Sequence, residues 1–222
     1  RLVITRNEVR LEEQAAQSKI IEINDLDGSP RKIGVIDVPA FYLDFDAYRK
    51  GDPDFRSTTR DVGKLVAELN EAGVDGLVID LRGNGGGSLR EANELTGLFI
   101  EYGPTVQIKG TGSRVWRDGK RRRGPFYEGP VAVMIDRLSA SASEIFAGAL
   151  QDYGRAIIVG DRSFGKGTVQ TLLDLPEGQL KITESKFYRI SGESTQHRGV
   201  IPDISYPSLL QHDEIGESSL EK

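Results

Sequence analysis

The sequence of 222 residues contains no cysteine and only two histidines, His197 and His212. Without cysteine the chain has no thiol nucleophile, no disulfide bond and no thiolate metal site. A zinc site would have to consist almost entirely of carboxylates, which is unusual, so we expect neither a metal nor a cofactor. A serine–histidine–aspartate triad would depend on one of these two histidines.

The sequence also lacks a long apolar run and an excess of positive charge. No stretch approaches the roughly 20 apolar residues needed to span a membrane, and no secretory signal is recognisable. The net charge is −5, so we expect no general affinity for nucleic acid. The chain starts at Arg1 rather than at a methionine, so we expect a fragment of a longer protein, and the missing signal carries little weight.

The middle of the chain alternates between apolar strand patterns and helical patterns. The strand patterns are short and apolar, and several end at glycine or proline, whereas the helical patterns repeat apolar residues at a spacing of three to four. This alternation predicts an α/β fold of layered helices and sheet, with additional antiparallel strands at the edges. The expected strands are 32–39, 76–82, 130–136 and 156–160, and the expected helices are 59–72, 89–100 and 141–153.

The flanking regions are less regular. We expect residues 44–60 to form a polar loop and residues 105–129 to form a short hairpin with Asp118-Gly119 at its turn. The basic run 120–123 is interpreted as a solvated strand end. We divide the chain into an N-terminal segment that packs on the core (1–32), the core itself (33–209) and a disordered tail (210–222).

The serine cluster Ser139–Glu144 lies between a predicted buried strand and a predicted helix. Ser141 and Glu144 have the spacing of a capping box, in which the serine caps the helix and the glutamate reaches back to it. The same position would expose the Ser141 hydroxyl as a nucleophile at the sheet edge, where the Ala142 amide at the helix N-terminus is placed to stabilise an oxyanion. Spacing alone leaves both interpretations open and favours the cap.

Two glycine-rich segments follow predicted strands. Residues 83–87 form either a flexible turn or a place where a ligand approaches the backbone closely, and they lack the third glycine of a dinucleotide fingerprint. Residues 160–168 nearly match a phosphate-binding loop, but Gly167 occupies the position of the metal-binding hydroxyl and no helix pattern follows. A nucleotide site is therefore disfavoured, and Lys166 is either a surface lysine or a base that activates Ser141.

Asp152 is a further candidate on the predicted helix that starts at Ser141. It comes 11 residues later, close to three turns, and so shares a helix face with the serine. The rise of an α-helix places it about 16 Å along the axis, however, so direct contact with Ser141 is not expected. We predict a structural or ion-pairing role.

Five motifs carry a resemblance: Asp80–Gly87, Ser139–Glu144, Asp152–Gly154, Phe164–Gln170 and Ser194–Asp203. Together they resemble the C-terminal processing peptidases, a Ser–Lys family of the S41 type, and within it the tail-specific branch. The resemblance extends over about residues 5–207 and implies a serine endopeptidase on a crotonase-like layered αβ core. In the glycine loop many relatives have a proline where this chain has Gly85, as in the tail-specific branch.

The resemblance implies a role for each matching residue. A lysine base must be neutral to accept a proton, and because a free lysine has a pKa of about 10.4, the chemistry requires surroundings that disfavour the ammonium. The implied positions are Ser141 as nucleophile, Lys166 as general base, Gln170 to orient the lysine amine, Ala142 with Gly86 or Gly87 as oxyanion-hole amides, and Glu144 and Asp152 as supports.

The resemblance also implies partners. In the family a PDZ domain precedes the protease core and recognises substrate C-termini; none is visible here, so we expect an isolated core. The implied substrates are polypeptides with unfolded, apolar C-termini, and the implied location is the bacterial periplasm. One alternative is a truncated, inactive core that binds peptides by strand addition. Another is an acyl-CoA enzyme on the same layered core, which would leave Ser141, Lys166 and Gln170 unexplained.

Overall fold

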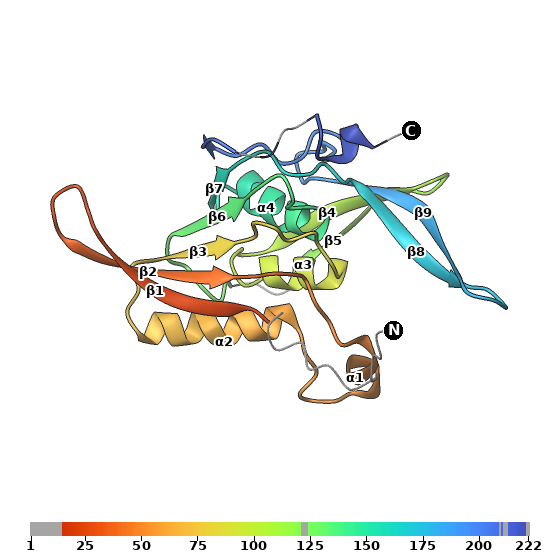
Figure 1. Ribbon diagram of the computed structural model, residues 1–222. Helices are drawn as coiled ribbons and strands as arrows, with labels where there is room; N and C mark the ends of the chain where they lie inside the picture. Colours follow the sequence, from red (N-terminus) through yellow and green to blue (C-terminus); the bar gives the residue numbers. More distant parts are fainter. Residues whose placement is uncertain (1–14, 121–123, 209, 211–212, 221–222) are drawn as a thin grey trace, which may run out of the picture.

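A computed structural model describes residues 15–120, 124–208, 210 and 213–220, and its main element is a six-stranded sheet (Figure 1). The strand order is β1-β2-β3-β6-β7-β10, parallel from β2 onward, with β1 antiparallel at the edge. The intervening segments return the chain to the same end of the sheet, as parallel pairing requires. The strands are β1 (Gln17–Asn24), β2 (Pro30–Asp37), β3 (Gly76–Asp80), β6 (Val131–Ile135), β7 (Ile157–Gly160) and β10 (Ile204–Ser205).

A second, four-stranded antiparallel sheet has the order β5-β4-β9-β8. Its strands are β4 (Gly103–Gly110), β5 (Trp116–Lys120), β8 (Thr168–Asp174) and β9 (Gln179–Tyr188). The hairpin formed by β8 and β9 projects away from the body of the molecule (Figure 1). The mixed α/β class with antiparallel additions is therefore confirmed.

The helices are α1 (Phe45–Lys50), α2 (Thr58–Glu71), α3 (Leu89–Thr96) and α4 (Ala142–Asp152), followed by a 3₁₀ turn at Glu217–Ser219. Helix α2 packs against β1 and β2, α4 packs against β7, and α3 lies against both α2 and α4. Helices α3 and α4 also contact β4 of the second sheet, so they link the two sheets.

The core of the large sheet is a row of β-branched residues that face one another across neighbouring strands. Ile36, Ile79, Val133 and Ile158 are cross-strand partners in β2, β3, β6 and β7, and each is fully buried. Phe146 of α4 packs beside this row, with its ring centroid 6.0 Å from that of Phe99. Such near-continuous apolar strands are typical of a parallel sheet, and they explain why the strand patterns were readable in the sequence.

Two expectations about the flanking regions are wrong. Asp118-Gly119 lies inside β5 rather than at a turn; the turn occupies residues 111–115, where the Ser113 hydroxyl accepts the Gly110 N–H at 2.9 Å. Residues 44–60 contain α1 and the start of α2. Within the expected N-terminal segment, residues 17–32 form β1 and the start of β2 in the large sheet.

The described part of the tail contacts the core. Within 213–220, the Ile215 carbonyl accepts a hydrogen bond from the buried Arg137 guanidinium, and Glu217 N–H donates to the Phe164 carbonyl at 3.0 Å. The basic run 120–123 is described only at its first residue. The Lys120 ammonium donates hydrogen bonds to the carbonyls of Gly97 and Ile100, so it is not free in solvent.

Candidate active site

The candidate site forms where three neighbouring parallel strands end at the same edge of the sheet. The glycine loop 83–87 follows β3, the serine turn 136–141 follows β6, and the lysine loop 161–167 follows β7. Since β3, β6 and β7 are adjacent and parallel, their loops meet at one edge, the usual ligand position in such sheets. A cavity of about 530 Å³ opens there, and its lining includes Gly87, Ser141, Ala142, Lys166 and Gln170.

Ser141 has a strained backbone conformation at the N-cap of α4. Its φ is 56° and its ψ is −108°, a region that a residue with a Cβ occupies at a cost of order 1–3 kcal/mol. A sharp strand-to-helix turn of this kind lifts a serine hydroxyl out of the sheet in other hydrolases. The cap and nucleophile interpretations thus meet in one residue, because the cap position is what presents the hydroxyl to the cavity.

Glu144 connects the serine turn to the lysine loop. Its Oε2 accepts the N–H groups of Ser141 at 2.8 Å and Lys166 at 2.9 Å, while its Oε1 accepts Ser163 Oγ–H at 2.6 Å and Gly165 N–H at 2.7 Å. Burial raises the pKa of Glu144 to about 7, against the lowering effect of these four donors. One side chain therefore fixes the backbone of both members of the expected pair.

The glycine loop approaches the serine turn too closely for any side chain. A Cβ on Gly86 would lie 2.8 Å from the Ala140 carbonyl oxygen and 2.9 Å from Ser141 Cβ. The Gly86 N–H donates to Asn84 Oδ1 at 2.8 Å, so it is not available to an oxyanion. Within the described part of the chain, the Gly87 and Ala142 amides have no acceptor, and both residues line the cavity. Of the two expected glycines, Gly87 is therefore the one that fits.

Lys166 and Gln170 both line the cavity, and among the described residues no hydrogen bond joins them. Gln170 Nε2 donates weakly to Thr183 Oγ1 at 3.4 Å on the neighbouring strand β9. No hydrogen bond joins Lys166 Nζ to Ser141 Oγ or to Gln170 among the described residues. The expected nucleophile, base and glutamine therefore line one cavity without being joined to one another by a described hydrogen bond.

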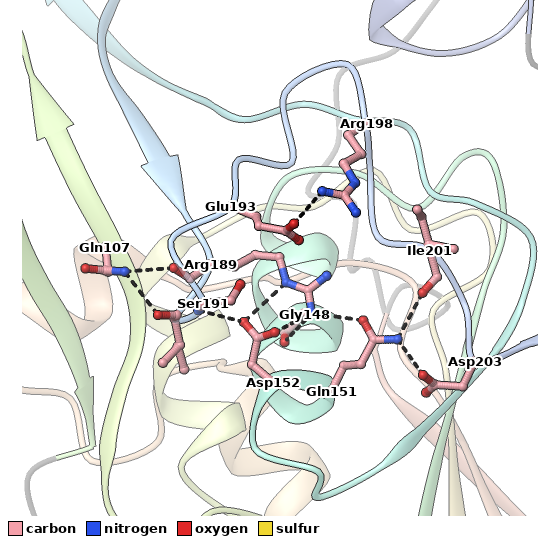
Figure 2. A network of polar contacts seen from close by, with 11 residues as sticks. Gln107, Gly148, Gln151, Asp152, Arg189, Ser191, Glu193, Arg198, Ile201 and Asp203 are labelled. Atoms are coloured by element: carbon pink, nitrogen blue, oxygen red, sulfur yellow. Dashed lines mark hydrogen bonds and ion pairs between the residues drawn. The ribbon is translucent and has the colours of Figure 1, made fainter.

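Asp152 lies at the far end of α4 and forms an ion pair with Arg189, as its position on the helix predicted (Figure 2). The carboxylate accepts two hydrogen bonds from the guanidinium, at 2.5 and 3.2 Å, and both side chains are largely buried. Arg189 also donates to Gln151 Oε1 at 2.9 Å, and Gln151 in turn donates to Asp203 Oδ1 at 2.8 Å. The network fastens the end of β9 and the segment before β10 to the helix that carries Ser141.

Two contributors to the site were not singled out by the sequence. Asn84 is fully buried: its side chain donates to the Val38 carbonyl at 2.7 Å, and its own carbonyl accepts Ala140 N–H at 3.0 Å. Phe41 brackets the glycine loop, since its N–H donates to the Gly86 carbonyl and its carbonyl accepts Ser88 N–H. Asn84 lay inside a quoted motif, whereas nothing in the local pattern pointed to Phe41.

The two histidines do not supply a triad in the described residues. His197 has an exposed side chain and is absent from the cavity lining, while His212 lies outside the described part of the chain. Within the described ranges, no group of three or more acidic or histidine side chains has an arrangement that would hold a metal ion. A search of the same ranges finds no helix with both the length and the apolarity to cross a membrane.

A sequence model of peptidase family S41 matches residues 32–206, which include all three loops of the site. The chain belongs to this family. It is 41% identical over 225 aligned residues to the tail-specific protease of Haemophilus influenzae, an alignment that covers 97% of the chain and 30% of that relative. It is 46% identical over 131 residues to the carboxy-terminal-processing protease of Bartonella bacilliformis, covering 58% of the chain and 30% of the relative.

Among solved structures, the photosystem II D1 C-terminal processing protease superposes with a TM-score of 0.71 at 26% identity. That superposition covers 97% of this chain and 54% of the other. The chain thus spans about a third of the length of the curated relatives it matches and about half of the matched structure.

Proposed function

We propose that this chain is the catalytic core of a serine endopeptidase that uses Ser141 and Lys166 as its nucleophile and base. The observation that carries the proposal is the strained Ser141 turn, which faces a cavity also lined by Lys166 and is fixed to the lysine loop through Glu144. Membership of peptidase family S41 supports this chemistry.

In the proposed reaction the neutral amine of Lys166 takes the proton of the Ser141 hydroxyl as Oγ attacks the carbonyl carbon of the scissile peptide bond. The resulting ammonium gives the proton to the leaving amine, which departs as the new N-terminus of the second product. A water molecule, activated by the same amine, then hydrolyses the acyl ester and releases the serine.

The negative charge of the tetrahedral intermediate needs donors that are already in place. We assign this role to the N–H groups of Ala142 and Gly87, because both lack an internal acceptor and border the cavity. Ala142 is also the first residue of α4, where the helix dipole favours a developing negative charge. Gln170 is proposed to turn towards Lys166 when substrate fills the cavity.

The proposal is tested by hydrolysis of an unfolded polypeptide with an apolar C-terminus. Ser141→Ala and Lys166→Ala should each abolish cleavage and leave the fold intact by circular dichroism. Lys166→Arg should not restore activity, because arginine stays protonated. Cleavage that survives Ser141→Ala would refute the assignment, and a serine-directed phosphonate that failed to label Ser141 would favour a module that only binds peptides.

Finer features of the proposal rest on the relatives. The core is proposed to have crotonase-like layering, and the substrates are proposed to be polypeptides with unfolded, apolar C-termini, in keeping with the names of the relatives. A PDZ domain is proposed as a partner of this core, and the bacterial periplasm as its location. These features are tested by the cleavage preference of the purified protein and by fractionation of its host cells.

A further inference from the structure

Residues 44–56 form a closed excursion beside the catalytic cavity. Its ends are joined because Asp44 N–H donates to the Arg56 carbonyl at 2.9 Å and Leu43 bridges to Ser57 in antiparallel fashion. The excursion contains α1, which is capped by Asp44 at its start and has no buried residue. A compact loop with tied ends that adds nothing to the core is typical of a segment kept for function.

The excursion reaches the catalytic cavity through Phe45. This side chain lies at the first position of α1 and is 54% exposed, yet it lines the same cavity as Ser141 and Lys166. A large aromatic ring half-open to solvent beside a nucleophile offers apolar surface that a substrate side chain would cover.

A second contact holds the excursion against the glycine-loop side of the site. The Arg90 guanidinium lies 4.1 Å from the centroid of the Tyr48 ring and donates to the Tyr48 hydroxyl. Arg90 also donates to Glu94 Oε1 at 2.6 Å, which fixes its direction along α3. Since Arg90 itself lines the catalytic cavity, the contact lies at the rim of the substrate path. Inside the excursion, Tyr48 packs edge-on against Phe55 at 5.3 Å.

We propose that the excursion 44–56 is a wall of the substrate cleft, in which Phe45 determines specificity for an apolar side chain next to the scissile bond. Tyr48 acts as a positioning residue, because its contact with Arg90 keeps the wall beside Ser141. The inference rests on the proposed peptidase function and extends it to a segment outside the catalytic loops.

The test compares two peptides that differ only at the residue next to a mapped cleavage site, with leucine in one and serine in the other. The protein should prefer the leucine peptide by about tenfold in kcat/KM, as expected for one apolar contact. Phe45→Ala should reduce that preference to below about threefold, mainly through KM, and Phe45→Leu should restore most of it. Tyr48→Ala should raise KM for both peptides, and Tyr48→Phe, which keeps the ring under Arg90, should behave nearly as the unaltered protein.

Lys50→Ala is the matched control, because Lys50 is exposed on α1 and does not line the cavity. An unchanged leucine preference in Phe45→Ala, or an equal loss in Lys50→Ala, overturns the inference even if cleavage depends on Ser141. Affinity is measured separately in a Ser141→Ala background by fluorescence anisotropy of the labelled leucine peptide. About tenfold weaker binding on adding Phe45→Ala supports the wall even if the hydrolytic assignment fails, and equal binding refutes it.

Discussion

Replacement of Glu144 by glutamine tests how the site is held together. The carboxylate accepts four hydrogen bonds, and two of them come from the backbone of Ser141 and Lys166. In Glu144→Gln one of the two oxygens becomes an NH₂ group, which cannot accept and which faces two donors. We expect turnover to fall by about 100-fold, because a displacement of about 1 Å in either loop separates the nucleophile from its base.

The same substitution has a consequence for stability that depends on pH. Burial raises the pKa of Glu144 in the folded protein to about 7, above its ordinary value of 4.5. A carboxyl whose pKa is higher in the folded than in the unfolded state contributes stability while protonated. The contribution is complete below about pH 4.5 and is lost as the pH rises through about 7. At about 1.4 kcal/mol per pKa unit, the loss amounts to about 3 kcal/mol.

The assay is urea denaturation of the unaltered protein and of Glu144→Gln at a series of pH values from 4 to 8. The free energy of unfolding of the unaltered protein minus that of the variant should fall by about 3 kcal/mol across this range. A difference that grows with pH would refute the reasoning, because it would mean that the four donors outweigh burial and keep Glu144 ionised.

Three further predictions follow from backbone geometry and ion pairing. Gly86→Ala should abolish cleavage and lower the melting temperature, because the new Cβ would lie 2.8 Å from a carbonyl oxygen of the serine turn. Gly85→Ala is the control, because a Cβ there meets no atom within 4 Å and the melting temperature should not change. Equal melting temperatures for the two variants would contradict this. Asp152→Asn should lower the free energy of unfolding by about 2–4 kcal/mol, because it removes the charged partner of Arg189, whose side chain is only 13% exposed. Adding Arg189→Met should recover part of this loss in denaturation experiments. No recovery would argue against the ion pair. Ser141→Gly should be more stable than Ser141→Ala by about 1 kcal/mol in thermal melts, because glycine tolerates the positive φ of this position. Equal stability of the two variants would show that the turn is unstrained.

Much of the layered core could be predicted because its signals are local. The helix expected at 59–72 is observed as α2 at Thr58–Glu71, and the strand expected at 130–136 as β6 at Val131–Ile135. In both cases the type and the ends of the element follow from residues within it: the spacing of its apolar residues and a glycine, proline or cap residue at its end. The ion-pairing role of Asp152 was also predictable, since helix rise alone excluded contact with Ser141.

The failures have a different physical origin, because they depend on pairing between distant segments. Strand β1 is exposed along its whole length, so its sequence lacks the alternation of apolar and polar residues that predicts a half-buried strand. It is a strand because it pairs with β2. Gly119 has the local pattern of a turn residue, but it lies in β5. The glycine is needed there because a Cβ would come 2.5 Å from the Gly103 carbonyl oxygen of the paired strand β4. The proposed choice of Gly87 over Gly86 as an oxyanion-hole donor rests instead on a local contact, because the Gly86 N–H donates to the Asn84 side chain two residues earlier.

The geometry of the candidate dyad is determined by backbone contacts between loops rather than by contact between the two reactive side chains. Asn84 joins the glycine loop to the serine turn, the Ser139 carbonyl accepts Phe164 N–H at 2.9 Å, and Glu144 joins the turn to the lysine loop. Because each loop leaves an adjacent strand of a rigid sheet, these contacts leave little freedom to the backbones of Ser141 and Lys166. In the proposed proton transfer, the groups that still have to come together are therefore the side chains of Lys166 and Gln170, which both line the cavity.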